Sequence, residues 1–329
     1  MVAKLPAYEL FTGVTPNPRC ATAEAIAAQY RASGCDSLIA IGGGSPMDAA
    51  KAAAAQIARP HRSVEQLGGL LKVRRNIPPF IAVPTTAGTG SETTIAAVVT
   101  DDTHHKYAIN DLCLVPRYAV LDPKLTVSLS PAVTAQTGMD ALTHAVEAYL
   151  SCRMTTKETD SLAEQATVTI FRYLERCYQH GDDLQARQAL LTASYQAGCA
   201  FTRACVGNVH AIAHTLGGLY DVPHGLANAI LLPVILRDYG EAVHKKLARL
   251  AELTGVRCNG SDEQKANAFI DEIFAMNRRM GIAEGFDCIR KADMPQMAIW
   301  ADAEANPVYP VPVIYENDDF IRIIKKVRL

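Results

Sequence analysis

The spacing of apolar and polar positions changes near residue 125. Before that point, short apolar runs alternate with helix-like segments, which is typical of a parallel α/β layer. The apolar runs predict strands at 37–41, 80–83, 95–100, 106–110 and 118–121, and helices at 21–33 and 46–58. A turn of Asp, Thr and His residues at 101–105 separates two of these strands.

After Asp122-Pro123, apolar residues recur at helical spacing between Gly, Pro and polar breaks. This pattern predicts helices at 131–151, 160–179, 184–202, 209–219, 225–239, 243–254 and 262–280. An extended docked segment at 306–312 precedes a short final helix. The change of pattern at 124–130 therefore predicts an α/β domain at 1–127 and an all-helical domain at 128–329.

Composition and charge narrow the classes of partner. With 32 Lys and Arg against 34 Asp and Glu, the net charge is -2, so we expect no nucleic acid or anionic membrane as a partner. No apolar stretch is long enough to be a signal peptide or a membrane span. The nine cysteines form no C-x-x-C pair, and their odd number favours reduced thiols. We therefore expect a cytoplasmic protein.

A glycine-rich turn, Gly42 to Gly44, follows the first predicted strand. We expect Ser45 to cap the next helix in a capping box with Asp48, and Pro46 to be the first helical residue. The start of such a helix binds pyrophosphate, although a plain connection explains this turn alone equally well. The hydroxyl-rich loop 85–91 ends the next strand at the same edge of a parallel sheet, which favours a nucleotide site.

The helical region carries a group of carboxylate and imidazole side chains. Asp140 and His144 lie one helical turn apart, His210 and His214 repeat that spacing, and His224 precedes another helix. Taken alone, Asp140 and His144 are better explained as an ion pair on the helix surface. Taken alone, His210 or His214 is better explained as a histidine of the core. Their clustering in apolar segments instead favours a metal site, because one carboxylate and three imidazoles suit Fe(II) or Zn(II).

Four sequence blocks carry a resemblance that covers nearly the whole chain. They are GGGSPMD at 42–48, PTTAGTGSE at 84–92, GMDALTHAVEA at 138–148, and HAIAH at 210–214 followed by PHG at 223–225. In this order they resemble the iron-containing, or group III, alcohol dehydrogenases. The resemblance implies a Rossmann-like, parallel-sheet α/β domain that binds a dinucleotide and an all-α metal-binding domain. This is a dehydroquinate synthase-like architecture, with the active site in the cleft between the domains.

The resemblance also assigns roles to residues of the helical domain. It implies that Asp140, His144, His210 and His224 hold Fe(2+), and the same donors also accept Zn(2+). His214 matches a further histidine close to the metal. We expect it to relay a proton to solvent, and a role in orienting a ligand is an equally good interpretation. We expect Glu147 to be a polar residue of the helix end and not a fifth ligand.

The cofactor implied by the resemblance is NAD, with NADP as the alternative. The residues expected to contact it are Asn17, Gly43, Gly44, Ser45, Asp48, Thr85, Thr86, Thr89, Lys106 and Leu125. The implied reaction is hydride transfer between this cofactor and a small primary alcohol, diol or aldehyde whose oxygen the metal polarises.

Two alternatives stay open at this point. One is a zinc glycerol-type dehydrogenase, against which the third imidazole counts. The other is a fragment that keeps the metal site and binds cofactor too weakly for turnover. Family members begin with a further strand–helix–strand segment, whereas this chain starts near the loop Pro16-Asn17-Pro18. We therefore expect an exposed sheet edge, and a homodimer if that edge is completed or paired.

Overall fold

The computed structural model of this chain describes residues 7–101 and 106–329. Residues 102–105 of the turn expected at 101–105 lie outside the described ranges. Two compact units are present. We call residues up to Thr85 with Ser91–Asp122 the α/β unit, and Thr86–Gly90 with Pro123–Leu329 the helical unit. The sequence-based boundary after residue 127 stays a prediction.

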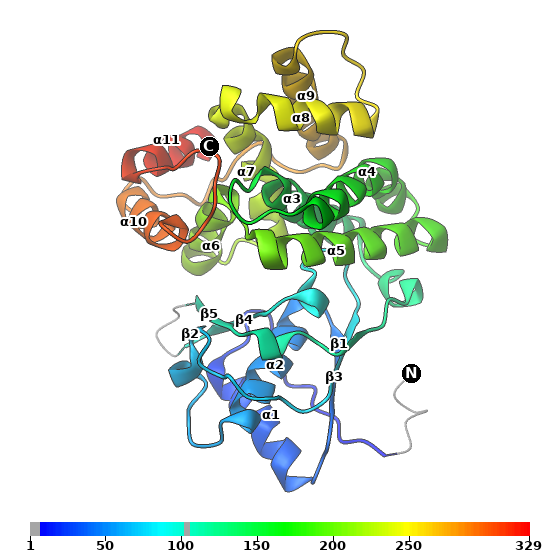
Figure 1. Cartoon of the computed structure of the whole chain (residues 1–329), viewed down its shortest axis with the longest axis vertical. Coiled ribbons are helices and arrows are strands. Elements are labelled where there is room, and N and C mark those ends of the chain that lie inside the picture. The colour runs from blue at the N-terminus through cyan, green and yellow to red at the C-terminus, as the bar shows by residue number, and fades with distance from the viewer. Residues whose placement is uncertain (1–6, 102–105) are drawn as a thin grey trace. The chain divides into compact units, whose positions relative to one another are not determined.

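The α/β unit contains two small sheets (Figure 1). Strands β1 (Leu38–Gly42), β3 (Phe80–Pro84) and β6 (Tyr118–Ala119) form a parallel sheet in the order β1-β3-β6. Strands β2 (Gly69–Leu70), β5 (Lys106–Asn110) and β4 (Ala96–Thr100) form the second, in which β4 is antiparallel to β5. The predicted parallel α/β region is confirmed, whereas β2 was missed because two residues show no periodicity.

Helices α1 (Cys20–Ala32) and α2 (Gly44–Ala58) pack on each other, and α2 also packs on β1 and β4. The buried side of α2 is almost entirely alanine, and such small side chains let the helix backbone approach its neighbours closely. The remaining connections carry the short helices η2 (Glu65–Leu67), η3 (Ser91–Thr93) and η4 (Leu112–Leu114).

A buried cation ties α2 to the segment that follows the second loop. The side chain of Lys51 is fully buried, and its Nζ donates to the carbonyl oxygens of Ser91 at 2.6 Å, Thr94 at 2.8 Å and Ala96 at 3.0 Å. Burial lowers the pKa of Lys51 to about 8, against the opposing charge of Asp48. Asp48 in turn accepts a hydrogen bond of 2.8 Å from Ser91 Oγ. These bonds fix residues 91–96 against the helix.

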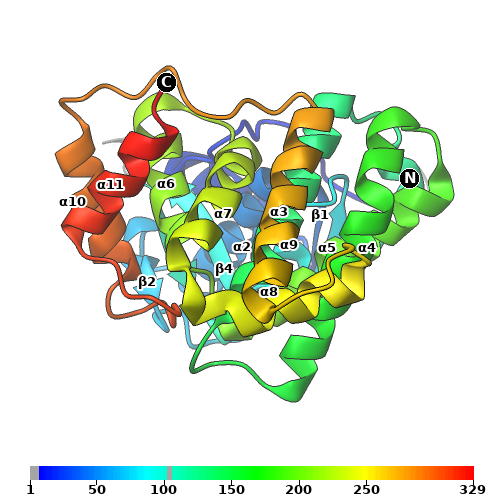
Figure 2. The same cartoon turned by 90° about the horizontal axis from the view of Figure 1, so that it is seen from above.

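The helical unit is built around α3 (Pro131–Leu150), which packs against α4, α5 and α7 (Figures 1 and 2). The other helices are α4 (Lys157–Gln179), α5 (Leu184–Ala204), α6 (Asn208–Tyr220), α7 (His224–Tyr239), α8 (Glu241–Thr254), α9 (Asp262–Arg279), α10 (Met294–Ala305) and α11 (Asn317–Val327), preceded by the short η5 (Pro123–Thr126). The all-helical expectation is confirmed. Helix α10 was missed because its apolar residues form no regular stripe.

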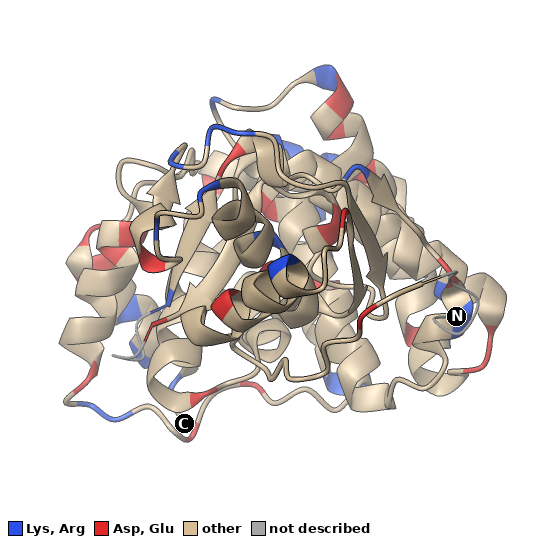
Figure 3. Ribbon diagram, turned by 90° about the horizontal axis from the view of Figure 1, so that it is seen from below, with Lys and Arg blue, Asp and Glu red and all other residues tan. Residues whose placement is uncertain are grey.

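No helix within the described ranges is both long and apolar enough to cross a membrane. Lys, Arg, Asp and Glu are interspersed in the view of Figure 3, consistent with the near balance of 32 basic and 34 acidic residues.

Loop 86–90 packs with the helical unit, although both of its flanks belong to the α/β unit. A Cβ atom added to Gly88 would lie 2.8 Å from Cβ of Thr137 in α3. One added to Gly90, whose φ is +59°, would lie 2.8 Å from Cα of Gly198 in α5. Both contacts are too short for any side chain, so glycine is required at both positions.

We predict that Glu92→Gln stabilises the protein in a pH-dependent way. Glu92 is 3% exposed, and no hydrogen bond to its Oε1 is found among the described residues. Burial raises its pKa from 4.5 to about 7. The folded state therefore holds this proton more tightly than the unfolded state, and the resulting stability is lost as pH rises from 4.5 to 7.

Glu92→Gln should raise the free energy of unfolding above that of the wild type. This gain should be about 2 kcal/mol larger at pH 8 than at pH 5. Urea unfolding at the two pH values measures this difference. A difference that is the same at both values contradicts the prediction.

Candidate metal centre and cofactor loops

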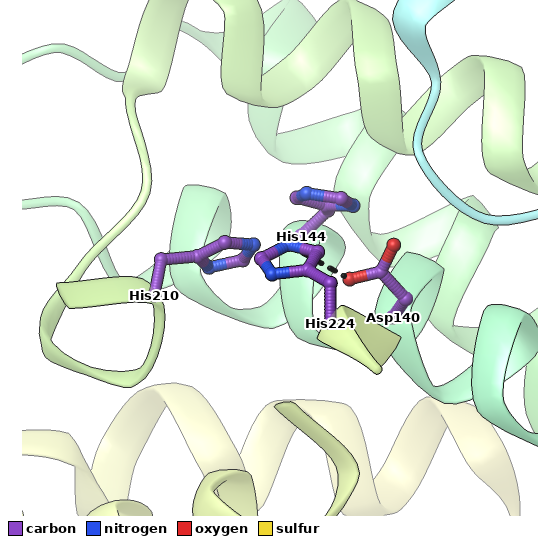
Figure 4. A group of neighbouring side chains, drawn as sticks. All are labelled: Asp140, His144, His210 and His224. Atoms are coloured by element: carbon purple, nitrogen blue, oxygen red, sulfur yellow. Dashed lines mark ion pairs between the residues drawn. The ribbon is translucent and has the colours of Figure 1, made fainter. Parts of the chain in front are cut away.

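Four side chains of the helical unit converge on one point (Figure 4). Asp140 and His144 come from α3, His210 comes from α6, and His224 is the first residue of α7. One potential ligand atom from each lies within 4.8 Å of the others. Asp140 and His144 are buried, at 2% and 4% exposure. The interpretation of this pair as a surface ion pair is therefore wrong, because this face of α3 lies in the core.

Close packing of two helices sets the position of His224. A Cβ added to Gly225 would lie only 2.4 Å from the carbonyl oxygen of Gln136, so the start of α7 lies directly on the backbone of α3. This approach brings His224 Nε2 to 3.6 Å from Asp140 Oδ1. The ring of His144 stacks on the rings of Phe201 and His210, with distances between ring centroids of 4.2 Å and 4.6 Å.

Burial sets the charge of the imidazoles. It lowers the pKa of His144, with Asp140 opposing, and it holds the pKa of His210 well below the usual range. Both rings are therefore neutral near pH 7, and neutral imidazole is the form that binds a metal.

Glu147 stands behind His210. Its carboxylate accepts from His210 Nδ1 at 2.5 Å and from the backbone N–H groups of Gly207 at 2.9 Å and Val209 at 2.8 Å. Glu147 lies outside the four-donor group, and it is buried and binds the start of α6. Burial raises the pKa of Glu147, and the N–H groups of Gly207 and Val209 oppose this rise by stabilising the carboxylate. This role was not predicted from the sequence, although a Glu in so apolar a helix segment indicates that the carboxylate has a buried partner.

Asn228, one turn after His224 in α7, is a second polar residue that the sequence analysis missed. Its side chain is fully buried. Its Nδ2 lies 2.7 Å from Asp140 Oδ1, 3.1 Å from His210 Nε2 and 3.2 Å from His224 Nε2. A lone Asn in an apolar helix gives no signal of such contacts in sequence.

His214 lies beside the four donors without being one of them. Its ring stacks on that of His224 at 5.2 Å, and its Nδ1 lies 2.6 Å from Glu304 Oε1 in α10. The same carboxylate oxygen accepts a 2.6 Å hydrogen bond from Tyr309 Oη. The role of His214 as a proton relay stays a prediction.

The glycine-rich turn forms a helix start of a different kind from the one expected. Helix α2 begins at Gly44 with Gly43 as its N-cap, and no side chain caps it. The capping box of Ser45 and Asp48 is therefore wrong: both residues lie inside the helix, and Asp48 accepts from Ser91. The N–H of Thr85 donates to Gly42 O at 2.9 Å, which joins the two predicted cofactor loops.

The other predicted cofactor residues are divided between the units. Asn17 is exposed, and Pro18 next to it accepts from Thr100, which pairs with Lys106 across β4 and β5. Asn17 and Lys106 thus lie at one end of that sheet. Thr86, Thr89 and Leu125 belong to the helical unit.

We predict that Glu147→Gln weakens Zn(II) binding about tenfold or more, because a carboxylate that holds a ligand histidine typically contributes that much to metal affinity. Competition with a chelator measures the affinity. Glu304→Gln is the matched control: it alters the carboxylate that holds His214, which lies outside the donor group, and should leave affinity unchanged. Equal losses in both variants, or none in Glu147→Gln, contradict this assignment.

Comparison with known proteins identifies the family. Residues 2–123 match the family model "Iron-containing alcohol dehydrogenase", and residues 134–327 match "Fe-containing alcohol dehydrogenase family, C-terminal". The chain is 41% identical over 302 residues to the 1,3-propanediol dehydrogenase of Klebsiella pneumoniae, covering 90% of this chain and 77% of that protein.

Solved structures agree with this relationship. A crystal structure of 1,3-propanediol oxidoreductase has a TM-score of 0.92 and 38% identity, covering 97% of this chain and 84% of the other. Sulfoacetaldehyde reductase from Bifidobacterium kashiwanohense, solved in complex with NAD+, has a TM-score of 0.86 and 30% identity. This match covers 97% of this chain and 83% of the other. Because the two family matches span nearly the whole chain and the four-donor group lies within the second, this protein belongs to the iron-containing alcohol dehydrogenases.

Proposed function

We propose that this protein interconverts a small primary alcohol or diol and its aldehyde by hydride exchange with NAD(H), using a metal held by Asp140, His144, His210 and His224. The observation that carries the proposal is the convergence of these four donors within 4.8 Å of one another. The names of the relatives favour three-carbon diols and aldehydes as the substrate class.

The residues fit a divalent cation. One carboxylate and two buried imidazoles with lowered pKa values, completed by His224, match the donors that Fe(II) and Zn(II) take. When bound, such a cation supplies Lewis acidity toward the alcohol or carbonyl oxygen of the substrate. Iron is the metal of the family, and NADP is the alternative to NAD as cofactor.

The surrounding side chains prepare the site for this chemistry. Glu147 accepts a hydrogen bond from the Nδ1–H of His210. The other ring nitrogen, Nε2, therefore carries a lone pair, and it faces the other metal donors. His214 is our candidate for exchanging the substrate proton with solvent, because its side chain is 35% exposed and Glu304 holds its Nδ1. Contact with Glu304, outside the donor group, favours this relay over a role in orienting a ligand.

The start of α2 is our candidate for the pyrophosphate site. Gly43, Gly44 and Ser45 offer backbone N–H groups at the positive end of the helix dipole, and no side chain of this helix caps them. The zinc glycerol-type alternative is not favoured, since it leaves the third imidazole unused. Nor is the impaired fragment, since both the cofactor and metal regions match the family.

We further propose that the protein works in the cytoplasm as a homodimer. None of the nine cysteines, all of which lie in the described ranges, forms a disulfide bond, which suits a reducing compartment. Strand β1 is an edge of the described parallel sheet and exposes 41% of Ile39, so it offers a surface for pairing.

The direct test is anaerobic loading of the purified chain with Fe(II) or Zn(II), followed by NADH consumption at 340 nm with lactaldehyde, propionaldehyde and butyraldehyde. We expect turnover that depends on the added metal. His210→Ala should lose bound metal and turnover together, with its circular dichroism unchanged. Full activity in His210→Ala contradicts the ligand assignment, and metal binding without NADH binding contradicts the dehydrogenase.

Gly44→Val tests the pyrophosphate site separately. A branched side chain at the first residue of α2 stands between the helix start and the phosphates, so NADH binding should weaken about tenfold or more while metal content stays the same. Titration of NADH fluorescence measures the affinity. An unchanged dissociation constant contradicts the assignment of this turn.

A further inference from the structure

Asn228 occupies an unusual place among the metal donors. It lies one turn after His224 on α7, and its amide nitrogen faces three of the four proposed donor residues at hydrogen-bond distance, between 2.7 and 3.2 Å. One NH2 group has two hydrogens for these three acceptors. The amide therefore points into the space where the cation of the proposed function would sit.

The partners of this amide determine its orientation. Asp140 Oδ1, at 2.7 Å, accepts hydrogen bonds, so the amide atom that faces it is the nitrogen. A donor directed at His210 Nε2 requires a lone pair on that atom, and Glu147 on the other side of the ring receives the Nδ1–H. Asn228 and Glu147 thus select the same tautomer of His210 from opposite sides, the one that a metal ligand needs.

The other end of the amide, the buried Asn228 Oδ1, is not held by a hydrogen bond from any described residue. No bond at that end opposes rotation of the side chain. A cation and an N–H group cannot both face the same lone pairs, because each presents positive charge to them.

We propose that Asn228 is a positioning residue of the metal site: its amide N–H groups hold Asp140, His210 and His224 in the arrangement that binds a cation, and when the cation enters it gives up the histidine nitrogens and keeps its hydrogen bond to Asp140. The retained bond orients the carboxylate that the cation binds, and a hydrogen bond of this kind on a metal ligand typically contributes about tenfold or more to metal affinity, so loss of Asn228 weakens binding. This inference rests on the metal site of the proposed function and adds a residue to it.

Asn228→Leu tests the proposal with a matched control. Asn277 is also a buried asparagine whose Oδ1 has no hydrogen bond from the described residues, and its Nδ2 donates to Ala229 O at 2.6 Å, away from the donor group. In chelator competition with zinc alone, Asn228→Leu should bind Zn(II) about tenfold more weakly or worse. Asn277→Leu should retain the wild-type affinity. A loss below tenfold in Asn228→Leu, or an equal loss in Asn277→Leu, overturns the proposal.

A measurement on the wild type avoids any folding defect of the variants. In 15N-labelled protein, addition of Zn(II) should shift the side-chain amide resonances of Asn228 and leave those of Asn277 in place. The resonance missing from Asn228→Asp assigns the signal. An Asn228 signal that does not move while zinc binds overturns the proposal alone. Failure of the wild type to bind zinc overturns the metal site itself.

Discussion

The metal-donor group depends on one buried carboxylate, that of Glu147. It binds the N–H groups of Gly207 and Val209 at the start of α6 and the imidazole of His210 within the first turn of that helix. The position of α6 relative to α3 and the direction of the His210 lone pair are therefore set by the same side chain. Glu147 thus both holds α6 in place and orients a metal ligand. It can do so because a buried carboxylate is stable only when hydrogen-bond donors such as these surround it.

Close backbone approach is the second requirement of the site. Gly225 lets α7 lie on the carbonyl oxygen of Gln136, and this contact places His224 beside Asp140. The backbone of Cys205 at the end of α5 has φ +64°, a conformation that favours glycine, immediately before the turn into α6. Strained backbone of this kind persists only where the surrounding packing holds it, and here it shapes the segment that carries Gly207 and Val209 to Glu147.

The sequence predicted the helices with strong periodicity, and helical spacing places Asp140 beside His144 without any tertiary information. The choice of His210 and His224 as further donors came from the resemblance to the family, because spacing alone pairs His210 with His214, which lies outside the group. It did not predict β2, which is too short to show a period, or the cap of α2, where Gly43 replaced the expected Ser45. Asn228 and Glu147 were missed for a different reason. Their roles come from partners far away in the chain, and a single sequence records no such pairing.

Loop 86–90 makes the helical unit discontinuous in sequence, since its flanks at Thr85 and Ser91 belong to the other unit. No single cut of the gene therefore separates the two units intact. A shortened chain beginning at Pro123 lacks the backbone that Gly88 and Gly90 place on α3 and α5, and it exposes to water the helix surfaces around Thr137 and Gly198.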